Sequence, residues 1–130
     1  MRHTVLLLLL ISLTSFNSNR TEDEQKIIQK CFDLKRVMIF FHEKQVIILD
    51  NGKVSSKIKL NKYGQQVLFM TENELREKNI KAFVVFHTLD IEKNLASVYF
   101  RLDSEGMGAE IKLKKQKSDW KVISEKVYEN

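Results

Sequence analysis

Side chains that could act as nucleophiles or transfer protons are scarce in this sequence. Cys31 is the only cysteine among 130 residues, so the chain can form no intrachain disulfide. A thiol beside an imidazole can act in nucleophilic catalysis. Cys31, however, falls at helical spacing among apolar residues in the sequence QKCFDL, which favours a buried and unreactive thiol.

His87 is the candidate catalytic residue, and also a candidate for ligand binding. In the alternating stretch 82–91 it shares a face with apolar neighbours, which predicts that its side chain points inward. An inward histidine is either a hydrogen-bonded core residue or an acid–base group in a pocket. His42 lies in the polar sequence HEKQ and is expected in a solvated loop. His42 and His87, without Asp, Glu or Cys at ligand spacing, predict no metal site, and no cofactor motif is found.

Tyr99 and Trp120 are the other candidates for ligand binding. Trp120 lies in the lysine-rich sequence KLKKQKSDWKV, residues 112–122, which fits either a basic aromatic binding site or the last hairpin of a sheet. We expect the hairpin, with SD in its turn and with Trp120 and Val122 on one face of the closing strand, against a helix. The lysines then form a solvated edge that discourages pairing with other chains. Tyr99 is expected on the polar face of its strand.

The first 18 residues have the three-part organisation of a secretory signal peptide. A positive start, MRH, precedes the apolar run VLLLLLISL at residues 5–13, and small polar residues follow. The run is shorter than the ~20 residues that a membrane-spanning helix needs, although an N-terminal anchor is the alternative. We therefore expect an exported protein, periplasmic or secreted, that is cleaved between Ser15 and Asn19 and has no membrane span afterwards.

Residues 19–130 are predicted to form a single domain, because their number fits the usual size of one. The formal net charge of the whole chain is +5, from 22 basic and 17 acidic residues that are interspersed. Such mild basicity lacks the continuous positive stripe of nucleic-acid-binding proteins, so nucleic acid is not an expected partner.

An amphipathic helix is predicted to begin at Thr21, with Thr21 as N-cap and Glu24 in the capping-box position. The runs VMIFF and VIILD, residues 37–41 and 46–50, then predict a hairpin of two buried strands; a continuation of the helix through Phe41 is the alternative.

The middle of the chain predicts a turn, two strands and a second helix. The dipeptide Asn-Gly at residues 51–52 predicts a type I′ turn, and strands are expected in KVSSKIKL and YGQQVLFM, residues 53–60 and 63–70. A short helix is predicted near residues 72–79, with Thr71 as its N-cap and Asn79 as a left-handed stop.

The C-terminal half predicts an antiparallel meander with one solvated face. Residues 82–91, 95–103 and 109–117 alternate in polarity, and a fourth stretch begins at Trp120. The predicted fold class is therefore α+β, with the N-terminal helix packed on a curved antiparallel sheet and the short helix near 72–79 beside it.

The stretch 63–127 resembles the C-terminal sheet of cystatin-like and nuclear transport factor 2-like (SnoaL-like) domains. The sequences LDIEKN, LASVYF, AEIKLKK and SDWKV carry this resemblance. It implies a curved antiparallel sheet that wraps an N-terminal helix. Nuclear transport factor 2-like domains usually place several helices before the sheet, whereas one is predicted here, so the layout is closer to the cystatin-like domains. Isomerases, dehydratases, inhibitors and non-catalytic exported domains share this architecture, and the resemblance therefore implies a fold more than a function.

We expect a non-catalytic binding or accessory protein. Its partner would be another protein, an envelope component or a small apolar ligand in the concavity of the sheet. One alternative is a small lyase or isomerase that uses His87 in a pocket between helix and sheet, as the resemblance to dehydratases implies. A second alternative is a secreted cystatin-like inhibitor, although YGQQVLF lacks the glycine of the Gln-x-Val-x-Gly hairpin.

Overall fold

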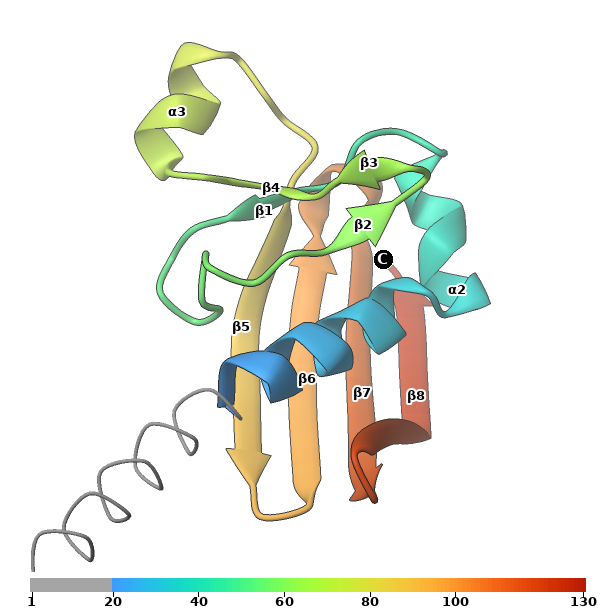
Figure 1. Cartoon of the computed structure of the whole chain (residues 1–130). Helices are drawn as coiled ribbons and strands as arrows, with labels where there is room; N and C mark the ends of the chain where they lie inside the picture. Colours follow the sequence, from blue (N-terminus) through green and yellow to red (C-terminus); the bar gives the residue numbers. More distant parts are fainter. Residues whose placement is uncertain (1–19) are drawn as a thin grey trace, which may run out of the picture.

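The structure is a computed structural model that describes residues 20–130, and its fold is mixed α+β (Figure 1). Its main sheet has six strands in the order β4-β1-β5-β6-β7-β8. The predicted α+β class is therefore confirmed. The predicted signal peptide and its cleavage region lie outside the described residues.

The predicted meander is confirmed, with strand ends within two residues of those expected. Its antiparallel strands are β5 (Val84–Glu92), β6 (Leu95–Leu102), β7 (Met107–Gln116) and β8 (Asp119–Glu129). Two-residue turns join β5 to β6 and β7 to β8, and the short helix η2 (Asp103–Glu105) joins β6 to β7. Alternate side chains of β6 are buried, which fits a sheet with one covered face.

The other two strands of the sheet are parallel to their neighbours. Strand β1 (Ile47–Leu49) pairs in parallel with both β4 (Leu68–Met70) and β5. A separate two-stranded hairpin consists of β2 (Asn61–Lys62) and β3 (Gln65–Gln66). The sheet is thus antiparallel only over its C-terminal four strands.

The hairpin predicted from residues 37–50 is wrong, and its helical alternative is closer to the structure. Helix α2 (Lys35–Met38) continues into the short helix η1 (Ile39–Phe41). Val37 and Phe41, four residues apart, are both buried, as on one face of a helix. Short apolar runs fit a buried strand or a buried helix equally well, so hydrophobic periodicity could not decide between them.

The turn and strand predicted at residues 51–60 are also wrong. A type I′ turn needs positive φ angles at both central residues, and of this pair only Gly52 has one, 83°. Residues 53–60 form no strand; side chains of the preceding helix bind the backbone of residues 55–61 instead. Glu24, Gln25 and Gln29 accept hydrogen bonds from the amides of Ser55, Lys59 and Asn61 respectively. Buried side chains in this loop produce the alternation that resembled a strand.

The short second helix is confirmed as α3 (Glu72–Glu77). Its capping box is complete, because Thr71 Oγ1 accepts from the Glu74 amide and Glu74 Oε1 accepts from the Thr71 amide. Asn79 has the predicted left-handed conformation, with φ 53°.

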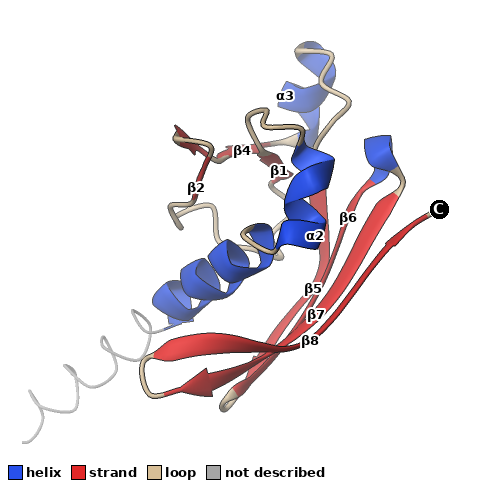
Figure 2. Cartoon of the chain, turned by 90° about the vertical axis from the view of Figure 1, so that its right-hand side faces the viewer, coloured by secondary structure: helices blue, strands red, loops and turns tan. Residues whose placement is uncertain are grey.

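Residues 20–32 are helical and lie against one face of the sheet (Figure 2). Residue 20 is already helical, so Thr21 lies inside this helix and is not its N-cap as predicted. The Phe32 ring lies 6.0 Å from Phe86 and 5.7 Å from Phe100, between centroids, which joins helix and sheet in one apolar core. No element of residues 20–130 covers the other face of β5–β8, which we call the open face.

Candidate functional site

His87 does not point into the core, so the prediction of an inward histidine is wrong. Its side chain is exposed. Phe86 pairs with Phe100 and Thr88 pairs with Tyr99, which leaves His87 as the extra residue of a β-bulge. A bulge interrupts the alternation on which the prediction rested. The His87 ring stacks instead on the Tyr99 ring, with centroids 5.2 Å apart.

Tyr99 lies in a polar and aromatic cluster at the centre of the open face. The Tyr128 hydroxyl donates to the Tyr99 hydroxyl at 3.4 Å. The Arg101 guanidinium lies 6.0 Å from the Tyr128 ring and donates from Nε to Asp103 Oδ1 at 2.7 Å. Tyr99 is therefore confirmed on the polar face, and its hydroxyl and ring both have partners there.

Gly108 gives the Tyr128 ring its place in this cluster. The two residues face each other in the pairing of β7 with β8. A Cβ atom at Gly108 would lie 2.5 Å from Cζ of Tyr128. The Tyr128 ring therefore occupies the space that the side chain of any other residue at position 108 would fill. It also covers the glycine backbone within the strand.

The hydrogen bonds in this cluster shift the pKa values of its two tyrosines in opposite directions. The hydrogen bond from Tyr128, and next the one from Arg101, lower the pKa of Tyr99. The same hydrogen bond to Tyr99 raises the pKa of Tyr128. Asp103 and then Tyr99 raise the pKa of Arg101, which keeps its charge. Tyr99 is therefore the more acidic phenol of the pair, because its oxygen accepts the hydrogen bond that Tyr128 donates.

A shallow groove of about 440 Å³ runs beside this cluster across β5–β8. Its lining includes hydroxyl groups and both signs of charge, and it contains no thiol or imidazole. The polar residues that line it are Thr88, Ser97, Tyr99, Glu110, Lys112, Ser124 and Lys126. Such a surface can form hydrogen bonds and stack against a ligand.

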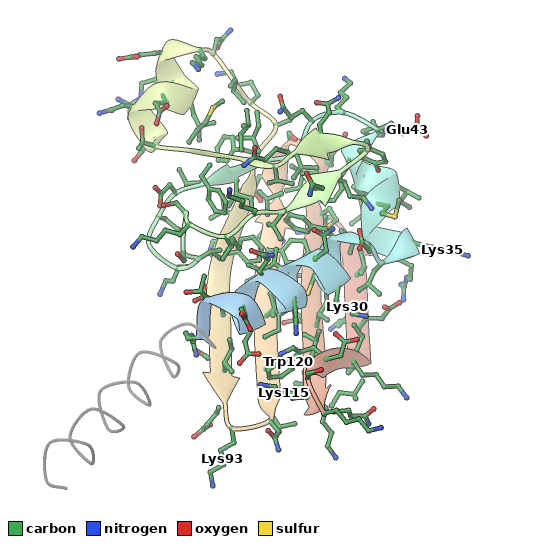
Figure 3. The ribbon with its side chains drawn as sticks, viewed as in Figure 1. Lys30, Lys35, Glu43, Lys93, Lys115 and Trp120 are labelled. Carbon is green, nitrogen blue, oxygen red and sulfur yellow. The ribbon has the colours of Figure 1, made fainter. Side chains whose placement is uncertain are left out.

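Trp120 lies on the covered face, so the hairpin interpretation of the lysine-rich sequence is confirmed. Its side chain is buried, and Nε1 donates to Asp23 Oδ1 of the helix at 3.0 Å. Lys115 turns to the same side, 3.2 Å from Asp23 and 5.9 Å from the Trp120 ring; Figure 3 shows Lys115 and Trp120 together beside the helix. Trp120 is therefore not accessible to a ligand.

The remaining chemical candidates lie apart from the open face. Cys31 is fully buried in the core, which raises the pKa of its thiol. His42 is exposed, as predicted, and its Nε2 lies 2.6 Å from Glu105 Oε1. Within residues 20–130, no three His, Cys, Asp or Glu side chains are grouped so that they could hold a metal ion. None of the helices in this part of the chain is long and apolar enough to cross a membrane.

The sequence interpretation missed the role of Gly108 and Tyr128. Gly106 supplies turn geometry at the end of η2, with φ 65°. Gly108, however, lies within β7 and not in a turn or bulge. An isolated glycine in a strand can signal that another group approaches the backbone closely, and that signal was present. The partner, Tyr128, lies 20 residues away and could not be identified without the register of β7 and β8.

Comparisons with known proteins found no match: no family model matches this sequence, and no curated protein or solved structure matches it significantly.

Proposed function

We propose that this protein is an exported, non-catalytic binding domain that holds a protein or an envelope component on the open face of its sheet. The observation that carries this proposal is the cluster of Tyr99, Tyr128 and Arg101 beside a polar groove, on a face without cover in the described structure. Tyrosine and arginine are the side chains that binding surfaces use most for anchoring a partner.

A large partner on the open face fits the structure better than a small apolar ligand on the covered face. Ile28 and Phe32 of the helix are fully buried against the sheet, as are Phe86 and Phe100. These side chains occupy the concavity in which a small ligand was expected. A partner on the open face would meet hydrogen-bonding groups and aromatic rings without any rearrangement of the core.

The catalytic alternative lacks the arrangement that it needs. A lyase or isomerase would require His87 in a cavity, beside a polar group that orients its ring. His87 is exposed on the bulge, and among the described residues no hydrogen bond joins its ring to another side chain.

The proposed relation to the cystatin-like and nuclear transport factor 2-like superfamily is retained as part of the binding proposal. The helix on a curved meander supports it, whereas the parallel strands β1 and β4 were not expected from it.

The proposal can be tested by photo-crosslinking in the cell that produces the protein. A photoreactive phenylalanine analogue would replace Thr88 or Ser124 in the groove, and Asn73 or Glu77 on the exposed helix α3 as matched controls. We expect adducts from the two groove positions only, and their mass distribution would identify a protein or a polymer. Equal adducts at all four positions, or none at the groove, would contradict the proposal.

Export is tested by N-terminal sequencing of the recovered protein. We expect the mature chain to start between residues 16 and 19.

A further inference from the structure

Four lysines project at the end of the sheet that carries its two tight turns, and we call this region the hairpin end. The β5–β6 turn contains Lys93 and the β7–β8 turn contains Lys117, at the same end of the antiparallel strands (Figure 1). Lys114 and Lys121 form the third residue pair from the β7–β8 turn. None of these four forms an ion pair with any residue in 20–130, and Figure 3 shows Lys93 extending away from the domain.

The fold holds these lysines in unfavourable positions. Lys114 and Lys121 are directly opposite each other in the register of β7 and β8, and like charges so placed repel. Lys93 and Lys117 have positive φ angles of 57° and 60°, where two-residue turns ordinarily use glycine or asparagine. No ion pair within residues 20–130 offsets the repulsion between Lys114 and Lys121. Local rules broken without compensation are typical of functional surfaces.

Exposed aliphatic side chains lie among these lysines. Leu95 is 54% exposed and lies opposite Lys114, and Ile123 is 53% exposed and follows Lys121 by two residues. They are two of the three large apolar side chains exposed in residues 20–130; the third, Ile39, lies in η1. Lysines around protruding aliphatic groups are typical of surfaces that lie at a membrane interface.

The N-terminal segment joins the domain at this end. Arg20 Nη1 donates to the carbonyl of Ile91, two residues before the β5–β6 turn. Two acids lie near these lysines: Glu92 lies opposite Leu95 on the side away from Lys114, and Asp119 forms an ion pair with Lys30 of the helix at 3.4 Å. The lysine side of the row is therefore free to meet an external anion.

We propose that the hairpin end binds the surface of a bilayer that contains anionic phospholipids. The ammonium groups of Lys93, Lys114, Lys117 and Lys121 would meet lipid phosphates, while Leu95 and Ile123 enter the boundary of the acyl chains. The hairpin end adjoins the groove on the open face, because Lys114 and Lys121 lie two and three residues from the groove residues Lys112 and Ser124.

Vesicle co-sedimentation of the mature chain, without the predicted signal peptide, tests this proposal. Vesicles of phosphatidylcholine alone would be compared with vesicles that also contain phosphatidylglycerol, at low and at high salt. The test variant combines Lys93→Gln, Lys114→Gln and Lys121→Gln. The matched control combines Lys44→Gln, Lys78→Gln and Lys81→Gln, which removes the same charge from exposed positions outside the hairpin end. Every variant lacks the apolar run at residues 5–13, so this run contributes nothing to the binding that is measured.

We expect the wild type and the matched control to prefer anionic vesicles at low salt. The test variant should lose this preference, with its partition coefficient lowered roughly tenfold to a hundredfold. A second variant, Leu95→Ser with Ile123→Ser, should reduce the binding that remains at high salt. Equal losses in the test and control variants, or no anionic preference in the wild type, would overturn the proposal. Loss of the groove photo-adducts in the lysine variant, without any effect of lipid, would assign the lysines to a protein partner and would also overturn it.

Discussion

Trp120 joins the last hairpin to the helix. Its indole is buried, and the ring nitrogen donates to Asp23. Replacing a buried tryptophan with alanine leaves a cavity and removes a large apolar surface from the core. Trp120→Ala is therefore expected to lower the free energy of unfolding by ~3–5 kcal/mol in urea denaturation. Trp120→Phe, which keeps most of the packing, should cost less; an unchanged free energy of unfolding in Trp120→Ala would show that this contact is not an anchor.

The thiol of Cys31 should make stability depend on pH under alkaline conditions. Burial raises its pKa, so the thiol stays protonated in the native state, whereas in the unfolded chain it ionises near pH ~8.5. Above that pH the unfolded state binds fewer protons than the native state, so the free energy of unfolding falls as pH rises. The contribution of burial is complete below this range and is lost progressively above it.

Cys31→Ala removes the titrating group and provides the comparison. The difference in free energy of unfolding between wild type and variant should shrink between about pH 7.5 and about pH 10. A difference that stays constant over this range would show that the thiol ionises equally in both states.

Tyr99 and Tyr128 should titrate in a fixed order. The hydrogen bond from Tyr128 lowers the pKa of Tyr99, and the same bond raises the pKa of Tyr128. NMR titration of the ring carbons should therefore show Tyr99 ionising first. Tyr128→Phe removes the donor and should raise the pKa of Tyr99, whereas Tyr63→Phe, outside this cluster, should leave it unchanged. Ionisation of Tyr128 before Tyr99 would contradict the hydrogen-bond direction in the cluster.

At the scale of single elements, the bulge at His87 has a consequence that can be measured. Phe86 and Leu89 are both buried, and with residue 87 removed Phe86, Thr88 and Leu89 would alternate regularly. Deletion of His87 should therefore leave both halves of β5 in register and yield a folded protein. Deletion of Glu110 in β7 is the control, because it places one half of a central strand on the wrong face. Circular dichroism and thermal denaturation would distinguish them, and unfolding of both variants alike would contradict the bulge assignment.

Elements with local determinants were predictable from sequence, and those that depend on distant partners were not. The alternation in β6 and the capping box of Thr71 and Glu74 are visible within a few residues, and both are confirmed. The loop at residues 53–60 is held by helix side chains such as Gln25, some 34 positions away, so its apolar alternation was mistaken for a strand. The pairing of β1 with β4 is likewise non-local.

The candidate site was predictable only in part for the same reason. Tyr99 was placed on the polar face by alternation alone. The bulge that exposes His87, and the register that places Tyr128 over Gly108, are properties of strand pairing and not of any one strand.

At the scale of the whole molecule, the helix covers one face of the sheet and leaves the other open (Figure 2). The two faces differ in chemistry as well as in cover. One is packed with apolar side chains around Phe32, and the other presents tyrosines, an arginine and a polar groove. A domain with one filled and one open face is suited to holding a partner on its surface, and the lysines of the hairpin end would fix which way that surface faces.

Hydroxyl-radical footprinting in the producing cell tests most directly whether the open face binds a partner. Tyr99, Tyr128 and Tyr63 are all half-buried, and Tyr63 belongs to the turn between β2 and β3, outside the open face. We expect oxidation of Tyr99 and Tyr128 to be lower in the cell than in the purified protein, while oxidation of Tyr63 stays the same. Equal oxidation of Tyr99 and Tyr128 in both settings would contradict the account, because the open face would then have no partner.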